Sequence, residues 1–295
     1  MHDAAYFVQL LLSGVTVGSL YALIAIGYTM VYGILRLINF AHGDIFMMAG
    51  FFMVYISASC SLAVSIPLVL ILTVLLGVLM GKAAYKPLRT APRMSVMISA
   101  IGVSYLLQNL ATYITGGIAR AYPDITFLTK VMQVGGLSIK RITIITPILT
   151  IVLVAILVVL IQKTKIGMAM RAVSRDFETS QLMGIKINSV ISMTFVIGSF
   201  LAGVASILYF ANYGQVSPMI GAMPGLKAFV AAVFGGIGSI PGAVIGAFII
   251  GICESFIKAN ENIAVFSNAF TFALLIIILL CKPNGLFGEK LTEKV

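Results

Sequence analysis

The sequence predicts an all-α, polytopic integral membrane protein with about eight or nine transmembrane helices. Of its 295 residues, 60% are hydrophobic and only 9% are charged, and the mean hydropathy is +1.11. A soluble domain carries about a quarter charged residues, so this chain has too few charges to cover a surface that faces water. Its uncharged runs have the length of membrane-crossing helices and are too long for the alternating strands of an outer-membrane barrel.

The candidate membrane helices are runs without a charged residue. The first run precedes Arg36, the first Lys or Arg of the chain, whereas a cleavable signal peptide begins with a positively charged region. We therefore expect this run to remain as a helix. Residues 45–58 form an apolar run that is short for a full crossing. The long runs are residues 4–35, 62–80, 94–115, 143–161, 189–211, 228–251 and 264–281.

The run at residues 228–251 is rich in glycine and contains Pro241, so it is a poor continuous helix. We predict a hairpin at residues 235–242, which brings the number of crossings to nine. Small residues in membrane helices usually serve helix packing. A break at membrane depth is tolerated only where it is buried in protein or lines a wet cavity, so the alternative is that Gly236 and Gly238 line or gate a path.

Basic residues gather in three regions that we assign to the cytoplasm, because cytoplasmic loops collect Lys and Arg. This assignment places the N-terminus outside and requires an odd number of crossings. The loop at residues 116–142 then lies outside, although it contains four basic residues. The net charge of +10 thus indicates orientation and lipid contact rather than nucleic-acid binding. The three regions contain Lys82, Lys86, Arg89 and Arg93; Lys163, Lys165, Arg171, Arg175 and Lys186; and Lys282, Lys290 and Lys294.

The sequence contains no signature of a nucleotide site, a metal site or a catalytic nucleophile. Residues 77–82 read GVLMGK, one residue short of a P-loop, and GGIGSIPG at residues 235–242 does not have the GxGxxG spacing. The GxSxG and HExxH patterns are also absent. We interpret Cys60, Cys253 and Cys281 as small buried hydrophobic residues, not as a disulfide or metal site. We therefore expect no cofactor and no catalytic residue.

The most unusual stretch is RLINFAHGD at residues 36–44, which places Arg36, Asn39, His42 and Asp44 between two apolar runs. Ionisable residues near membrane depth are costly unless they are paired or hydrated, so such a cluster is a functional candidate. One interpretation is an ordinary cytoplasmic turn at the lipid headgroups. The other is a partly buried segment in which Asn39 and His42 bind backbone groups or line a path.

Residues 163–188 form the longest polar segment on the predicted inner side, and the whole chain otherwise forms one membrane domain. Gly167 and Gly184 bracket the segment as helix punctuation. The like charges of Arg171 and Arg175, four residues apart, do not stabilise a helix by themselves and indicate an external partner. A basic helix on anionic lipid would look the same. The predicted apolar face consists of Met168, Ala172, Leu182 and Met183.

Four motifs resemble the LivH-type permeases of branched-chain amino acid ABC transporters. Residues 18–50 read GSLYALIAIGYTMVYGILRLINFAHGDIFMMAG, and their Asn-Phe-Ala-His-Gly element is typical of that family. The others are GMAMRAVSRDFETSQLMGIKINSV at residues 167–190, KAFVAAVFGGIGSIPGAVIG at 227–246 and KPNGLFG at 282–288. The resemblance spans the whole chain and is more specific for the permease than for its substrate.

The resemblance implies an assembly in the bacterial cytoplasmic membrane. The permease would pair with a second, homologous permease, receive substrate from a periplasmic binding protein and carry two cytoplasmic ATPase subunits. Arg171, Asp176, Glu178 and Gly184 would lie at the ATPase contact. Phe177 departs from the family, which often has proline or a small or polar residue there.

We expect the chain to import leucine, isoleucine or valine without covalent chemistry. A mostly apolar path suits these side chains, and Tyr21, Asn39, His42 and Gln108 are the candidates for contacting the zwitterionic head. The alternatives are a permease of the same family for urea, short amides or another small metabolite, an ion-coupled secondary transporter or channel, and an intramembrane enzyme that uses His42 or Asp44.

Overall fold

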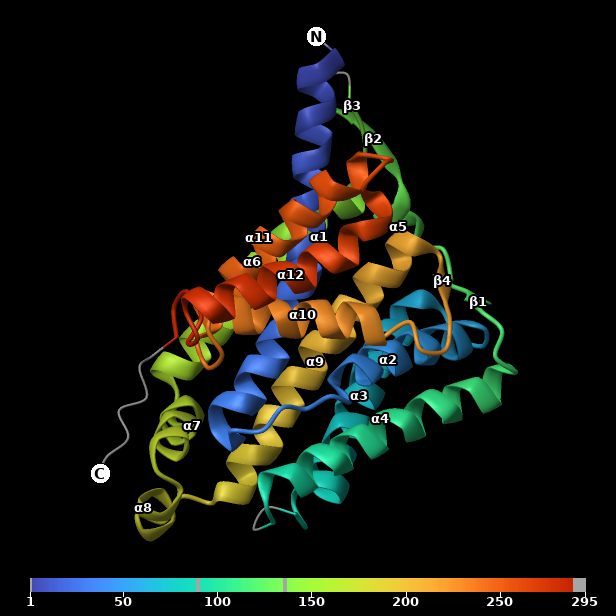
Figure 1. The fold of residues 1–295 in the computed structure, drawn as a ribbon. Coiled ribbons are helices and arrows are strands. Elements are labelled where there is room, and N and C mark those ends of the chain that lie inside the picture. Colours follow the sequence, from blue (N-terminus) through green and yellow to red (C-terminus); the bar gives the residue numbers. More distant parts are fainter. Residues whose placement is uncertain (1, 89–90, 135–136, 289–295) are drawn as a thin grey trace.

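The computed structural model describes residues 2–88, 91–134 and 137–288, and it confirms the helical membrane fold (Figure 1). Within these residues, seven helices are long and apolar enough to span a membrane, and two shorter apolar helices accompany them. The short helices are α2 (His42–Ser57) and α10 (Ala222–Gly235). The spans are formed by α1 (His2–Leu35), α3 (Leu62–Met80) with the π-helix Gly81–Tyr85, α4 (Arg93–Thr115), α6 (Arg141–Lys163), α9 (Ile187–Tyr213), α11 (Ile240–Ala259), and α12 (Ser267–Cys281) after the 3-10 turn Ala264–Phe266.

Helix α1 is the central element, and glycines allow α11 to lie directly against it. A Cβ atom on Gly14 would lie 2.7 Å from the Cα of Ile252, and one on Gly18 would lie 2.8 Å from the Cα of Phe248. Small residues permit such close backbone approach in lipid, where no hydrophobic driving force brings helices together. Gly14 and Gly18, spaced as GxxxG, therefore serve close helix packing.

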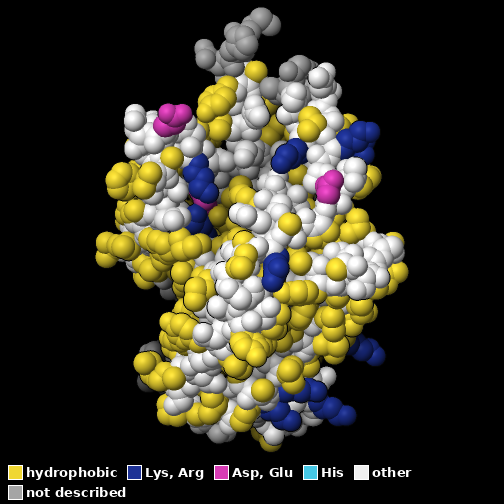
Figure 2. Space-filling model, turned by 90° about the vertical axis from the view of Figure 1, so that its right-hand side faces the viewer, with side chains coloured by type: hydrophobic (Ala, Val, Ile, Leu, Met, Phe, Trp, Pro, Cys, Tyr) yellow, Lys and Arg dark blue, Asp and Glu magenta, His cyan; other side chains and the backbone are white. Residues whose placement is uncertain are grey.

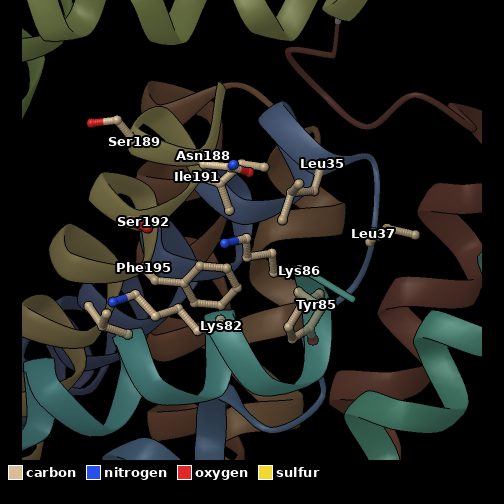
Figure 3. Close-up of a pocket in the computed structure, with 12 residues that line it drawn as sticks. Leu35, Leu37, Lys82, Tyr85, Lys86, Asn188, Ser189, Ile191, Ser192 and Phe195 are labelled. Carbon is tan, nitrogen blue, oxygen red and sulfur yellow. The ribbon is translucent and has the colours of Figure 1, made fainter. Parts of the chain in front are cut away.

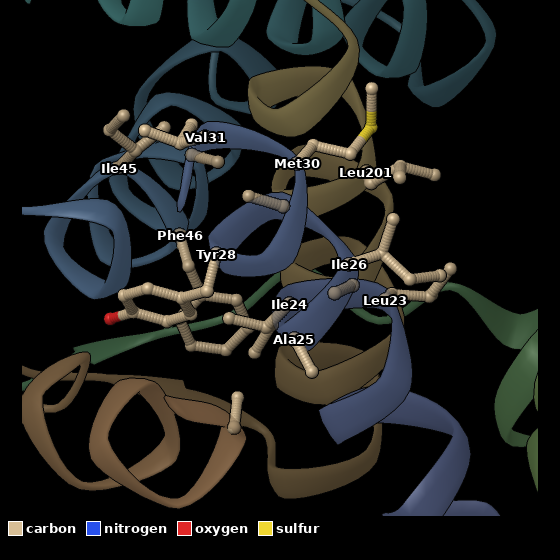
Figure 4. Close-up of a cluster of buried hydrophobic side chains, with 14 of the residues drawn as sticks. Leu23, Ile24, Ala25, Ile26, Tyr28, Met30, Val31, Ile45, Phe46 and Leu201 are labelled. Atoms are coloured by element: carbon tan, nitrogen blue, oxygen red, sulfur yellow. The ribbon is translucent and has the colours of Figure 1, made fainter. Parts of the chain in front are cut away.

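The middle of α1 is buried on all sides. Leu23, Ile24, Ala25 and Ile26 have no exposed surface, although they point in every direction around the helix. Figure 4 shows this part of α1 beside Ile45 and Phe46 of α2 and Leu201 of α9. A helix that is apolar all round is stable only inside a larger bundle, so α1 is the core around which the other helices pack.

The predicted break in the glycine-rich run is confirmed. Helix α10 ends at Gly235, and α11 begins at Ile240 with Ser239 as its N-cap, whose hydroxyl accepts a hydrogen bond from the backbone N–H of Gly242. Pro241 lies in the first turn of α11, where its missing N–H has no partner to lose.

The loop after α4 carries short strands that close one end of the bundle. β1 (Arg120–Ala121) pairs antiparallel with β4 (Gln215–Val216), and β2 (Val131–Val134) pairs with β3 (Leu137–Lys140). The single turn α5 (Thr126–Thr129) lies between them. Tyr122 packs on Phe210 of α9, with ring centroids 5.9 Å apart, and burial raises the pKa of its phenol. The loop is thus anchored to the bundle.

Two of the basic regions lie at the opposite end, as the orientation argument requires. The turn between α3 and α4 and the short helices α7 (Lys165–Arg175) and α8 (Phe177–Leu182) both lie at the lower end in Figure 1, away from β2 and β3. Figure 2 shows basic side chains mainly toward the two ends of one face, with hydrophobic ones between them. Arg89, Lys290 and Lys294 lie outside the described residues.

The prediction that the cysteines are buried is wrong for two of the three. Cys60 and Cys281 are exposed on the chain and Cys253 is partly exposed, and all three are free thiols. Cys60 follows the end of α2 and Cys281 ends α12, so both lie where a helix leaves the bundle. An apolar residue in a membrane helix can face either the lipid or the protein interior. Composition does not distinguish these two environments.

Candidate functional site

The segment between α1 and α2 turns back into the bundle. Helix α1 ends at Leu35, and Arg36 adopts a positive φ of 55°, a conformation typical of a turn. The chain then returns so that the imidazole of His42 lies against Gly27, where an added Cβ would be 2.1 Å from Nε2. Gly27 lies eight residues before the end of α1, so His42 is about 12 Å inside the helix end at 1.5 Å per residue.

Burial distinguishes the two interpretations of the RLINFAHGD stretch. Asn39, His42 and Asp44 are 1%, 2% and 2% exposed, and only Arg36 of the four polar residues is exposed. An ordinary turn at the lipid headgroups would leave these side chains in contact with water. The structure therefore corresponds to the second interpretation, a buried polar segment in the membrane domain.

Asn39 and His42, three residues apart in the same buried segment, both have spare hydrogen-bonding capacity. The Tyr85 hydroxyl donates to Oδ1 of Asn39 at 2.9 Å, and the Tyr28 ring meets the His42 ring edge-on at 5.0 Å between centroids. Nδ2 of Asn39 and Nε2 of His42 are buried without a hydrogen-bond partner among the described residues. Buried polar atoms are normally satisfied, so these two nitrogens make Asn39 and His42 candidates for binding water or a polar ligand.

Gln108 reaches the same region through Asp44. Its Nε2 donates to Oδ1 of Asp44 at 3.0 Å, and the Ser104 hydroxyl donates to Oδ2 at 2.5 Å. Ser104 and Gln108 lie one turn apart on α4, so both face α2. These contacts satisfy a carboxylate at the first turn of α2, where the helix dipole also favours a negative charge. Ser104 and Tyr85 were not among the predicted site residues.

The N-terminal ends of α2 and α10 meet beside this cluster. A Cβ on Gly43 would lie 2.6 Å from the carbonyl oxygen of Gly221, and one on Gly225 would lie 2.9 Å from the Cα of Gly43 and 3.2 Å from the Tyr28 hydroxyl. Two short helices therefore begin inside the bundle with their positive ends close together. Discontinuous helices of this kind form substrate and ion sites in membrane transporters.

Tyr21 belongs to a second, charged cluster. Its hydroxyl donates to Oε2 of Glu254 at 2.9 Å, while Oε1 of Glu254 accepts from Lys227 at 2.6 Å and from Lys258 at 2.5 Å. Glu254 and Lys227 are 1% and 5% exposed, whereas the Lys258 side chain is half exposed. Lys227 directly precedes the uncharged run at residues 228–251, and only the fold reveals that it is buried opposite Glu254.

Gly236 and Gly238 lie apart from both clusters. Both have positive φ values, 111° and 99°, as expected of glycines in a tight turn. A Cβ on Gly236 would lie 2.4 Å from the backbone nitrogen of Gly288, and Gly33 near the end of α1 is the neighbour of Gly238. The hairpin is thus at the level of the end of α1, next to the KPNGLFG tail, rather than at the depth of His42.

The predicted coupling residues occupy the exposed pair of helices α7 and α8. Arg171 is exposed and bonds the carbonyl of Gln162. Asp176 caps α8, accepting from the backbone N–H groups of Glu178 and Thr179. Glu178 is exposed in the first turn of α8, and Gly184 has a φ of 82° just after it. Asp176 therefore has a structural role in addition to the predicted one.

The apolar face predicted for this segment is not the one that packs. Helix α7 buries Gly167, Met170 and Val173, whereas Met168 is 61% exposed. Leu182 and Met183 at the end of α8 are 87% and 79% exposed. Asp176 starts a second helix, so Leu182 and Met183 lie on a different helix from Met168 and Ala172. Two large apolar side chains on a polar element are a feature of a protein-binding surface.

The comparisons with known proteins agree on one family. The family described as "Branched-chain amino acid transport system / permease component" matches residues 10–279. The high-affinity branched-chain amino acid transport system permease protein BraD of Pseudomonas aeruginosa is 38% identical over the full length of both chains. The corresponding protein LivH of Salmonella typhimurium is 39% identical over 98% of each chain. The ribose import permease protein RbsC of Haemophilus influenzae is 25% identical over 92% of this chain and 84% of its own.

Proposed function

This chain belongs to the family of permease components of branched-chain amino acid transport systems, and we propose that it forms part of the membrane channel through which leucine, isoleucine and valine enter the cell. The relatives that match over their full length are named as high-affinity branched-chain amino acid permeases. The family match extends over nearly the whole chain, so the proposal concerns the chain as one functional unit. The membrane is the bacterial cytoplasmic membrane.

One observation carries the proposal beyond family membership. Asn39 and His42 lie fully buried at membrane depth, each with a nitrogen that has no partner among the described residues, beside the meeting point of α2 and α10. If these groups served only helix packing, apolar replacements would make the protein more stable, because a buried polar atom without a partner costs about 1–3 kcal/mol. We infer that they contact the charged head of the substrate as it passes.

The substrate requires both apolar and polar surroundings along its path. Its aliphatic side chain is compatible with the apolar surroundings that the helices provide, whereas its ammonium and carboxylate groups need polar partners. Asn39, His42 and Gln108 are candidates at the first cluster, and Tyr21 with Glu254 and Lys227 at the second. A zwitterion is complementary to a site that contains both signs of charge. Gly236 and Gly238 are kept as candidates for lining or gating the path.

Energy has to come from partner subunits or an ion gradient, because the sequence contains no nucleotide-binding motif. We propose that two cytoplasmic ATPase subunits dock on α7 and α8 of this chain and of a second, homologous permease, with Arg171, Asp176, Glu178 and Gly184 at the contact. The exposed Leu182 and Met183 support this docking surface. A periplasmic binding protein would deliver the amino acid to the other end.

The test is uptake of labelled leucine by cells in which the gene is deleted and then restored. We expect uptake to fall on deletion, to return on restoration, and to follow ATP depletion rather than a proton uncoupler. In a strain that carries an epitope-tagged His42→Ala variant, detection of the tag shows whether the protein is present in the membrane when uptake is lost.

Two results would contradict the proposal at different points. If leucine uptake is indifferent to the gene, the substrate class is wrong, and labelled urea and short amides are the next substrates to measure. If uptake instead collapses with the uncoupler and survives ATP depletion, the chain works as an ion-coupled transporter and the ATPase docking surface has no function.

A further inference from the structure

A pocket of about 320 Å³ opens at the same end of the molecule as α7 and α8. It lies where the end of α1, the π-helix and the start of α9 come together (Figure 3). Its wall is mostly apolar, with Leu35, Val78, Ile191 and Phe195 among the lining residues. The pocket shares Tyr85 with the Asn39 cluster and otherwise lies outside the two polar clusters, so it requires its own explanation.

The pocket is basic on one side. Lys82 and Lys86 both line it, and both are exposed. The π-helix Gly81–Tyr85 lies between α3 and Lys86, and Figure 3 shows the Lys86 amino group pointing toward the start of α9. Among the described lining residues there is no Asp or Glu, and neither lysine forms an ion pair within the described part of the chain. The site therefore has an uncompensated positive charge.

The start of α9 adds an independent reason for the pocket to take an anion. Helix α9 is 27 residues long and begins at Ile187 without a side-chain cap. Its N-terminal end carries a partial positive charge, which favours an anion such as phosphate. Ser189 and Ser192 line the pocket from this first part of the helix, and Lys186 lines an adjoining pocket of about 520 Å³ that shares Ser189.

The surroundings distinguish a lipid from other anions. Val78 lines the pocket, and Leu75 and Leu79 beside it on α3 are 56% and 63% exposed, a face suited to acyl chains. A zwitterionic amino acid would bring its ammonium group toward two lysines with no acidic partner. We propose that this pocket binds the phosphodiester headgroup of an anionic phospholipid from the membrane leaflet on the side of α7 and α8, with an acyl chain along α3. Basic pockets between membrane helices on the cytoplasmic side are known to take such headgroups.

The bound lipid stabilises the polar segment through Tyr85. Tyr85 lines the pocket and also donates the hydrogen bond to Oδ1 of Asn39. A headgroup that holds Lys86 and the π-helix in place therefore also holds the partner of Asn39. The lipid would bind the native arrangement and not the unfolded chain, so its binding raises the stability of the permease.

The experiment measures lipid binding to the purified transporter by native mass spectrometry and its thermal unfolding with phosphatidylglycerol or phosphatidylcholine added. We expect phosphatidylglycerol to bind preferentially and to raise the unfolding temperature. The double variant Lys82→Gln, Lys86→Gln should lower its affinity about 30-fold, which corresponds to about 1 kcal/mol per lysine. The matched control, Lys130→Gln with Lys140→Gln in the exposed loop at the other end, should bind like wild type.

A second variant keeps the experiment decisive if the lysines are needed for folding. Ser189→Asp places a carboxylate in the first turn of α9, where it favours the helix but repels an anionic headgroup. We expect it to fold and to lose the preference for phosphatidylglycerol. The proposal is overturned if both variants retain that preference, or if inorganic phosphate competes equally well, since the pocket would then bind a soluble anion.

Discussion

Single glycines determine how the polar segment enters the bundle. Gly27 provides the space for the His42 ring, and Gly43, Gly221 and Gly225 allow the first turns of α2 and α10 to approach each other. At each position an added Cβ would lie within 3.0 Å of a neighbouring atom. In the sequence, these residues are only four of many glycines. The role of each depends on the atoms that lie opposite it in the fold.

At this scale we predict the effect of Gly27→Ala. The new methyl group would lie 2.1 Å from Nε2 of His42, which is itself fully buried, so the ring must shift. Overpacking of this kind costs about 1–3 kcal/mol. We expect a lower unfolding temperature of the purified protein and a loss of leucine uptake.

Gly102→Ala is the matched control for this prediction. Gly102 is also helical, and a Cβ there would meet nothing within 4 Å. Because alanine restricts the unfolded chain more than glycine, we expect a gain of about 0.5–1 kcal/mol or no change. Equal losses in the two variants would mean that the space beside His42 is not the cause.

At the scale of elements, residues 163–188 form two helices with separate tasks. Helix α7 packs on the bundle through Gly167, Met170 and Val173, whereas the end of α8 presents Leu182 and Met183 to the solvent. The sequence marked the segment as a partner-binding candidate, which stays a prediction, and failed to predict where its first helix ends. Asp176 follows the last residue of α7, and its side chain caps α8, so an aspartate at this position is a local signal for a new helix start.

We predict that Leu182→Asp uncouples the permease from its ATPase. A charge at the centre of an apolar contact removes an anchor residue, and such anchors typically contribute more than about 1 kcal/mol. We expect ATPase co-purification to fall roughly tenfold while the unfolding temperature of the isolated permease stays unchanged, because Leu182 makes little contact with its own chain.

Val265→Asp is the comparison variant, because Val265 is 85% exposed at the opposite end of the bundle. It should retain normal ATPase binding and leucine uptake. If Leu182→Asp retains them too, the tip of α8 is not a docking surface.

For the whole molecule, the charged cluster joins α1, α10 and α11. Tyr21, Lys227 and Glu254 come from positions far apart in the chain, and their side chains meet where the three helices cross. Removing one partner of a buried ion pair leaves the other charge without compensation, which costs more than the pair contributes. The cluster therefore constrains how these helices can be arranged.

We predict that the two buried charges of this cluster, Glu254 and Lys227, contribute unequally to the stability of the protein. Glu254→Gln leaves Lys227 buried without a carboxylate and should destabilise the protein by about 3–5 kcal/mol. Lys227→Met should cost less, because Glu254 keeps Lys258 and Tyr21 as partners. The double variant should be more stable than Glu254→Gln alone. Thermal unfolding of the three purified proteins measures this order, and equal losses for both single variants would contradict it.

The sequence by itself determined the membrane class, the helical runs and the break near Gly235. It also singled out Asn39 and His42 as site candidates, and their role stays a prediction. These conclusions rest on local properties: the length of uncharged runs, the chemistry of glycine and proline, and the cost of polar groups among apolar ones. The sequence could not determine that Tyr85 would meet Asn39, that Ser104 and Gln108 would share Asp44, or that Lys227 would lie buried against Glu254. Those contacts join residues 27 to 64 positions apart and depend on which faces of the helices come together. In lipid, all the apolar faces are nearly equivalent, so close packing at glycines and polar pairing decide that arrangement, and only the tertiary structure reveals it.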